Sequence, residues 1–173
     1  KEVFEKYPCT SISFIDSEFF VNMKRSKSLI YKIKEILPAN NGKPYYFYFR
    51  GVRANDLKRM DDEFLTFLNG LGIVIFYVGV ESVSPRLQKM LRKPINVDKL
   101  LNQNKRFSKY QNIRLGYNFM TGLPEEGSED LEQNIKICYR LVSDNKLSFI
   151  SGIAQFMPYP GTELYDYIVD KYN

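Results

Sequence analysis

Short apolar runs alternate along the chain with longer segments in which apolar residues recur at helical spacing. Five of these runs have the length and the Ile, Val, Phe and Tyr content of β-strands: Ser11–Ile15, Tyr45–Phe49, Ile73–Val80, about Ile113–Met120 and about Phe149–Phe156. The third run is apolar on both faces, which is typical of a parallel strand covered on both sides. Strict alternation of strand and helix predicts an α/β fold of parallel strands joined by right-handed crossovers.

The segments between the runs carry start and stop signals for helices. Ser84 and Pro85 supply a capping hydroxyl and a first-turn proline after the third run. After the fourth run, Ser128 is expected to cap a helix with acidic residues in its first turn. Gly72 is expected to end the helix between the second and third runs. The sequence therefore predicts a helix after each of the first four strands.

The length of the chain limits the architectures that five strands can build. A closed eight-stranded (β/α) barrel takes about 250 residues, more than the 173 of this chain. Five strands fit either an open doubly wound sheet or part of a larger barrel. Residues 1–8 resemble the tail of a helix whose own strand lies upstream. We therefore expect residues 1–173 to form a single domain that is a fragment of a longer protein.

The composition excludes several classes of enzyme. The chain has no histidine, which excludes Ser-His-Asp and Cys-His nucleophile systems and histidine-ligated zinc sites. The two cysteines, Cys9 and Cys138, are far apart in the sequence and form no local metal-ligand cluster. Sparse cysteines indicate a reducing compartment, and no apolar run approaches the roughly 18 residues of a membrane span. A cytoplasmic protein without a membrane partner is expected.

The net charge of +5 raises the question of a nucleic-acid partner. The basic residues are scattered through helix-like segments such as residues 23–34, and a solvated helix face accounts for such scatter. Charge alone therefore does not argue for RNA or DNA.

Polar residues follow the apolar runs at the carboxyl ends of the predicted strands, where ligands bind in parallel α/β folds. In chain order they are Asp16, Arg50 with Arg53, Glu81 with Ser82, and Thr121 with Gly122. Helix capping is an alternative role for Asp16 and Ser82, and Arg53 could be a surface residue. Glu81 is harder to explain in this way, because it ends an apolar run and a buried carboxylate is costly unless it is paired. Gly79, on the same strand face, would leave space below it.

Five segments, in order along the chain, resemble the barrel of radical S-adenosylmethionine (radical SAM) enzymes, and in particular the branch of Fe-S oxidoreductases that is associated with cobalamin-binding domains. They are Phe14–Phe19, Arg53–Asn55, Gly79–Ser82 with the following Lys93-Pro94, Asn118–Glu126 and Pro158–Tyr165. The resemblance implies a six-stranded partial (β/α) TIM-like barrel, of which this chain contains strands two to six.

The resemblance also implies a function and a set of binding residues. Enzymes of this family reductively cleave S-adenosylmethionine at a [4Fe-4S] cluster to generate a 5′-deoxyadenosyl radical that attacks a small-molecule substrate. Carried over residue by residue, the resemblance assigns contacts with S-adenosylmethionine to Asp16, Arg53, Glu81, Ser82, Asn118, Met120, Gly122, Phe156 and Pro158. Asn118 departs from the family pattern, which often has glycine there. An upstream cobalamin-binding domain is a further implied partner.

One part of the family pattern is absent from the sequence. The CxxxCxxC loop that follows the first strand and holds the cluster has no counterpart, since Cys9 stands alone. The isolated chain is therefore expected to bind no metal cluster and to be inactive, with the cluster ligands in a preceding segment. Two alternatives stay open: a cluster-free barrel that acts as a binding module, and part of an RNA-modifying radical SAM enzyme.

Overall fold

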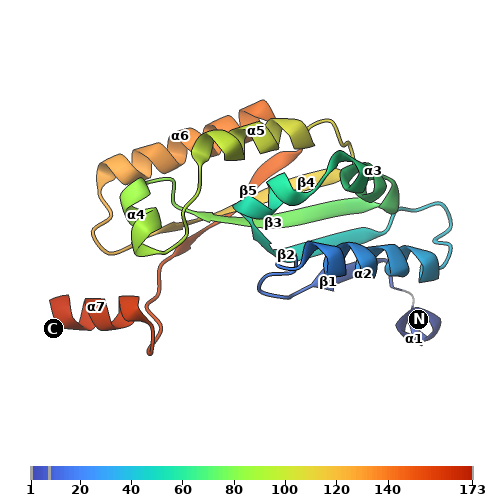
Figure 1. The fold of residues 1–173 in the computed structure, drawn as a ribbon, viewed down its shortest axis with the longest axis horizontal. Helices are drawn as coiled ribbons and strands as arrows, with labels where there is room; N and C mark the ends of the chain where they lie inside the picture. The colour runs from blue at the N-terminus through green and yellow to red at the C-terminus, as the bar shows by residue number, and fades with distance from the viewer. Residues whose placement is uncertain (1, 8, 173) are drawn as a thin grey trace.

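The computed structural model of the protein describes residues 2–7 and 9–172 (Figure 1). One parallel sheet consists of β1 (Ser11–Phe14), β2 (Tyr46–Arg53), β3 (Ile73–Glu81), β4 (Ile113–Thr121) and β5 (Ser148–Gln155). The helices are α1 (Glu2–Lys6), α2 (Met23–Ile36), the 3₁₀ helix η1 (Ala54–Arg59), α3 (Asp62–Leu71), α4 (Pro85–Met90), α5 (Val97–Phe107), α6 (Ser128–Asp144) and α7 (Glu163–Tyr172). None of the helices in the described ranges combines the length and apolarity that crossing a bilayer requires.

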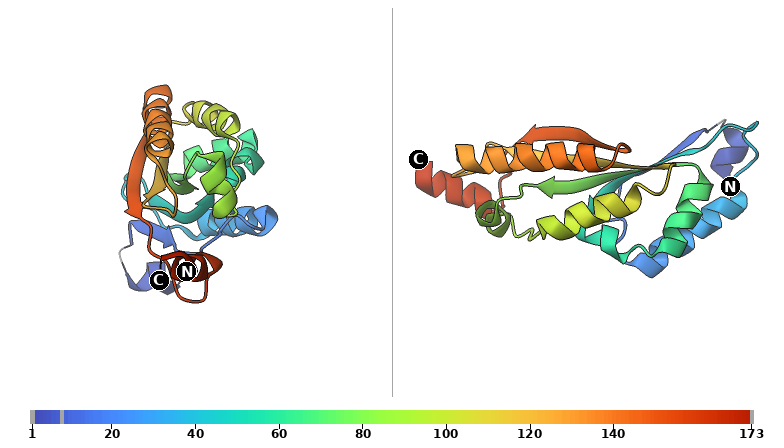
Figure 2. Two further views of the ribbon diagram at one scale, coloured as in Figure 1. Left: turned by 90° about the vertical axis from the view of Figure 1, so that its left-hand side faces the viewer. Right: turned by 90° about the horizontal axis from the view of Figure 1, so that it is seen from above.

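The order of the strands distinguishes between the two architectures that the sequence left open. Each strand pairs in parallel with its neighbours in the chain, in the order β1-β2-β3-β4-β5. A doubly wound sheet reverses direction at a switch point and carries helices on both faces. Here α2, α3, α5 and α6 lie on one side of the sheet, as the right-hand view of Figure 2 shows. The predicted α/β fold is confirmed, in the form of a partial barrel wall.

The predicted elements are present, with differences at their ends. The second strand continues to Arg53, so Arg50 lies within the strand and not after it. The predicted cap of α6 at Ser128 is wrong: Ser128 is the first residue of the helix, and Gly127 is its N-cap. The reason is that the carboxylate of Asp130 accepts the backbone N–H of Gly127, at 2.9 Å. In the segment at the amino end, α1 is present, and Lys1 and Pro8 lie outside the described residues.

A cluster of phenylalanines joins the first three strands to the segment that follows β1. Phe19 and Phe20 of that segment are almost fully buried, and Phe19 lies against Phe14 of β1 with ring centroids 4.7 Å apart. Phe49 of β2 stacks on Phe14 at 4.6 Å, and Phe20 contacts Phe76 of β3 at 5.7 Å. Aromatic pairs at these distances bury large apolar areas. The segment after β1 is therefore anchored in the core, and does not behave as a free loop.

A close backbone approach fixes the same segment against β2. A Cβ atom at Gly51 would lie 2.0 Å from the carbonyl oxygen of Asp16 and 2.5 Å from the backbone of Ser17. The backbone N–H of Phe19 donates to the carbonyl of Gly51 at 3.1 Å. Only glycine permits this distance, so Gly51 determines where residues 16–19 cross the end of β2.

Gly51→Ala is expected to lower the free energy of unfolding by about 1–3 kcal/mol, because the added methyl displaces backbone that is already packed. Gly70→Ala is the matched control, since a Cβ atom at this position of α3 meets nothing within 4 Å. In a helix this change should stabilise the protein, by roughly 0.5–1 kcal/mol. Urea unfolding measures the change in the free energy of unfolding for each variant, which should be a decrease for Gly51→Ala and an increase for Gly70→Ala. Equal changes in the two variants would contradict the close approach at Gly51.

Candidate functional site

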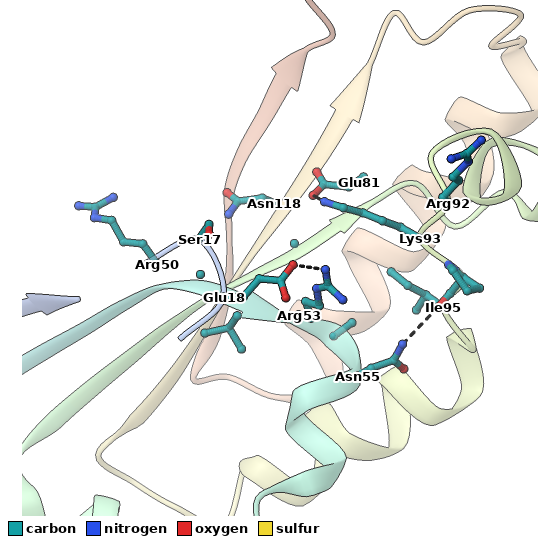
Figure 3. Close-up of a pocket in the computed structure, with 15 residues that line it drawn as sticks. Ser17, Glu18, Arg50, Arg53, Asn55, Glu81, Arg92, Lys93, Ile95 and Asn118 are labelled. Carbon is teal, nitrogen blue, oxygen red and sulfur yellow. Dashed lines mark hydrogen bonds and ion pairs between the residues drawn. The ribbon is translucent and has the colours of Figure 1, made fainter. Parts of the chain in front are cut away.

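A polar cavity of about 350 Å³ lies at the carboxyl ends of the strands. Its walls come from the segment after β1, from the ends of β2, β3 and β4, and from the loop after α4 (Figure 3). This position is the one at which parallel α/β folds bind ligands, and the volume falls within the range of small-molecule sites.

The regular parallel register breaks where the strands reach this cavity. The pairing of β2 with β3 shifts between Phe49 and Val52, and that of β3 with β4 shifts between Gly79 and Glu81. The pairing of β4 with β5 shifts next to Asn118. Such irregularities re-aim side chains and are common beside functional sites. In three neighbouring strand pairs, the residues near the cavity therefore do not follow the regular alternation of side chains between the two faces of the sheet.

Glu81 has the most constrained geometry in the cavity. Its backbone is in the left-handed region, with φ of 64°, which is uncommon for a residue other than glycine. Its side chain is only 15% exposed and pairs with Lys93, with Nζ and Oε1 2.9 Å apart. A Cβ atom at Gly79 would lie 2.8 Å from that Oε1. The expected space below the carboxylate is thus present, and the carboxylate occupies its edge.

Arg53 lines the cavity from the end of the neighbouring strand β2, where it pairs in register with Gly79. Its guanidinium is ion-paired with the carboxylate of Glu18, from the segment that Gly51 positions. Its backbone N–H donates to Oδ2 of Asp56 at 3.0 Å, and the same carboxylate pairs with Arg59, also at 3.0 Å. Since Asp56 is buried, the backbone of Arg53 is fixed even though its side chain is 61% exposed. Arg53 is therefore both a surface residue, as the sequence allowed, and part of the cavity wall.

Asn118 closes the cavity on the side of β4. The hydroxyl of Ser151 on β5 donates to Oδ1 of Asn118 at 2.6 Å. This bond uses the acceptor of the side-chain amide and leaves its NH₂ group as the donor that Asn118 offers to a ligand.

The structure brings together three of the nine predicted contact residues: Arg53, Glu81 and Asn118 all line the cavity. Asp16 is exposed and directly precedes the lining residue Ser17. Asp16 itself is not in the lining, and neither are the five remaining predicted residues, Ser82, Met120, Gly122, Phe156 and Pro158.

Ser82 faces the helices instead of the cavity. It is fully buried, and its hydroxyl lies 3.4 Å from Oδ1 of Asn134 on α6. The same hydroxyl accepts the backbone N–H of Ser84 at 3.2 Å. Its observed contacts hold the turn after Glu81 onto α6.

The remaining four predicted residues lie around the exits of β4 and β5. Gly122 has φ of 76°, in the turn after β4. The backbone N–H of Phe156 donates to the carbonyl of Thr121 at 2.8 Å, which brings the segment containing Pro158 alongside the end of β4. Met120 is the penultimate residue of β4.

Several lining residues were not among the predicted contacts. Glu18 and Lys93 each lie within a segment that resembles the family, and each is the ion partner of a predicted residue. Arg50 was noted at the end of the second run but given no role. The opposite charges of Glu18 and Arg53 are the only feature of the sequence that indicates their ion pair, and they do not predict it because the two residues are far apart in the sequence.

An iron–sulfur cluster does not fit the residues present. In the described part of the chain, no three His, Cys, Asp or Glu side chains are close enough together to hold a metal ion. Cys9 precedes β1, at the end of the strand remote from the cavity. Burial raises the pKa of the Cys138 thiol on α6 to about 11, so at neutral pH it is not the thiolate that ligation requires.

The left-handed backbone at Glu81 generates a prediction about stability. Both Glu81→Gly and Glu81→Ala remove the carboxylate, but only alanine keeps the steric cost of this conformation. The glycine variant is expected to be more stable than the alanine variant by about 1 kcal/mol in urea unfolding. At Glu132, within α6, the order should reverse, because glycine is the poorer helix former by about 1 kcal/mol. The same order at both positions would contradict the backbone conformation.

Two known proteins are similar to this chain over most of its length. A methyltransferase of Pyrococcus horikoshii, PH0819, which is described as uncharacterized, is 27% identical over 167 residues, which are 95% of this chain and 32% of the relative. The solved structure of the cobalamin-dependent S-adenosylmethionine radical enzyme OxsB, with aqua-cobalamin bound, matches with a TM-score of 0.59 at 21% identity, over 94% of this chain and 23% of that one. The chain thus spans about a third or less of the length of either protein.

The sequence model of the radical SAM superfamily matches residues 1–138, which include β1–β4 and most of α6. Together with the partial barrel and the cavity at its strand ends, this match shows that the chain belongs to the radical SAM superfamily.

Proposed function

We propose that this chain forms the S-adenosylmethionine-binding wall of the catalytic barrel in a radical SAM enzyme. The observation that carries the proposal is Glu81, a largely buried carboxylate that a left-handed backbone holds at the edge of the cavity. S-adenosylmethionine offers an ammonium and a ribose diol, and a carboxylate accepts charge-assisted or neutral hydrogen bonds from either group. Beside a reduced cluster, the bound cofactor is the source of the radical chemistry of this family.

The other lining residues have complementary roles in this proposal. Lys93 balances the charge of Glu81 until a ligand donor replaces it. Glu18 orients the guanidinium of Arg53. The planar guanidinium is proposed to bind the methionine carboxylate of S-adenosylmethionine, for which its geometry is suited. The proposed role of the Asn118 NH₂ group is to donate to an acceptor on the adenine. The cavity therefore offers an acceptor, a cation and an amide donor on three walls.

The six predicted contacts outside the lining keep roles at the rim or behind it. Ser82 supports Glu81 from the helix side through its bonds to Asn134 and Ser84. The proposed contacts of the others are at the entrance beside β1 and at the exits of β4 and β5: Asp16, Met120, Gly122, Phe156 and Pro158.

The cluster is proposed to be bound by cysteines that are not among these 173 residues, since Cys9 and Cys138 do not fit it. On this proposal the isolated chain binds the cofactor without reacting with it.

A cobalamin-dependent methyl transfer is the reaction class that we propose for the whole protein. Its support is the name of the Pyrococcus relative, a methyltransferase, and the cobalamin that is bound to OxsB. This chain has no histidine that could ligate cobalt, so the proposal assigns cobalamin to a separate domain that precedes the barrel.

Isothermal titration with S-adenosylmethionine tests the role of Glu81. Glu81→Gln is expected to weaken binding about ten- to hundredfold, the loss of one charge-assisted hydrogen bond at about 1.5–3 kcal/mol. Glu35→Gln, an exposed acidic residue near the end of α2, is the matched control and should bind like the wild type. Equal affinities of the two variants would show that the cofactor does not use Glu81.

Electron paramagnetic resonance of the full-length protein tests the cluster. After anaerobic reconstitution with iron and sulfide, the reduced protein should give a [4Fe-4S]⁺ signal that shifts when S-adenosylmethionine is added. A folded protein without a cluster would favour the binding module instead. Binding of transfer RNA with a steep dependence on salt would favour the RNA-modifying alternative.

A further inference from the structure

A row of side chains crosses the open face of the sheet, beside the cofactor cavity. It consists of Arg50 on β2, Tyr77 on β3 and Phe149 on β5, with Gly116 of β4 between the last two. Tyr77 pairs in register with Gly116, and Gly116 with Phe149. These residues point away from the helix-covered face, whose side chains form the core.

Each member of the row holds the next one in place. A Cβ atom at Gly116 would lie 2.7 Å from Cζ of Phe149, so the absence of a side chain lets the phenylalanine ring lie across β4. That ring meets Tyr77 edge to face, with centroids 6.3 Å apart and planes at 89°. The guanidinium of Arg50 lies over the Tyr77 ring, 5.0 Å from its centroid. The row therefore positions a cation through packing and not through an acidic partner.

Arg50 differs in this respect from the other cations of the cavity. Four basic residues line it, and three of them pair with carboxylates: Arg53 with Glu18, Lys93 with Glu81 and Arg92 with Glu163. For Arg50, the ring of Tyr77 is the contact found among the described residues. Its positive charge is not balanced by a nearby carboxylate in that part of the chain.

We propose that Arg50 binds an anionic group of the substrate, a carboxylate or a phosphate, next to the cofactor. This inference rests on the proposed function, because it takes the part of the cavity beside Glu81 to be filled by S-adenosylmethionine. The contact with the Tyr77 ring uses no acceptor oxygen, so the N–H groups of the guanidinium stay available for bidentate binding of a planar or tetrahedral anion. Figure 3 shows Arg50 directed away from the pair of Glu81 and Lys93, which lines the same cavity, so the proposed anion subsite adjoins the part of the cavity beside Glu81.

Nuclear magnetic resonance of protein labelled with ¹⁵N-arginine tests the proposal, with inorganic phosphate and acetate as probes and with S-adenosylmethionine present at saturation. The Nε–Hε signal of Arg50, identified by its absence in Arg50→Gln, should shift and saturate with one of the anions. The preferred anion separates a phosphate from a carboxylate substrate. The signal of Arg140, on α6 away from the cavity, controls for unspecific ion binding.

The supporting row gives a second measurement. Tyr77→Leu should weaken the anion at Arg50 at least fivefold and leave the affinity for S-adenosylmethionine within twofold. If Tyr77→Leu fails to fold, Arg50→Lys replaces it, because lysine keeps the charge but loses the bidentate edge, and the same fivefold loss is expected.

Two results would overturn the proposal. One is a shift at Arg50 that does not exceed the shift at Arg140, which leaves the row a packing feature alone. The other is an anion response that is present without S-adenosylmethionine and disappears when it saturates, which assigns Arg50 to the carboxylate of the cofactor. Failure of the proposed function is a distinct outcome, in which the protein does not bind S-adenosylmethionine while Arg50 still responds to the anions.

Discussion

The site depends on where the parallel hydrogen-bond ladder of the sheet stops being regular. Below that level, β2, β3 and β4 pair residue for residue, and their inward side chains pack under the helices. At the level of Phe49, Gly79 and Tyr117 the register shifts in neighbouring strand pairs. The rigid part of the sheet thus holds the strand ends in fixed positions, and the shifts turn the end residues toward a common cavity.

Two glycines shape the cavity at these strand ends. Gly51 lets the segment after β1 approach β2 closely, and this approach brings Glu18 to Arg53. Gly79 leaves the room that the Glu81 carboxylate borders. At Gly51 the neighbouring atoms are backbone, so a side chain there would displace the segment, whereas at Gly79 it would displace only the end of the Glu81 side chain. The two glycines therefore shape the cavity in which the proposed function places the ligand, and the family match does not depend on them.

Periodicity was sufficient to predict the five strands and their parallel pairing, because parallel buried strands have continuous apolar runs. It left the order of the strands open between a doubly wound sheet and part of a barrel. It also identified Glu81, since a carboxylate at the end of such a run stands out. Ser82 was assigned by resemblance, and the structure places it on the helix side, as alternation with Glu81 implies. The pairing of Arg53 with Glu18 was beyond prediction, because it depends on the path of the chain around Gly51. The cap of α6 was missed because Asp130 competes for it from within the helix.

Hydrogen–deuterium exchange with and without S-adenosylmethionine tests the central claim most directly, because it locates the bound cofactor on the chain. The account predicts slower exchange at the backbone amides of residues 50–55 and 79–82 and of Arg92, Lys93 and Ile95, and no change along the outer surface of α6, residues 131–142. Protection along α6 without protection at the strand ends would contradict the account, because it would place the ligand outside the cavity that Glu81, Arg53 and Asn118 form.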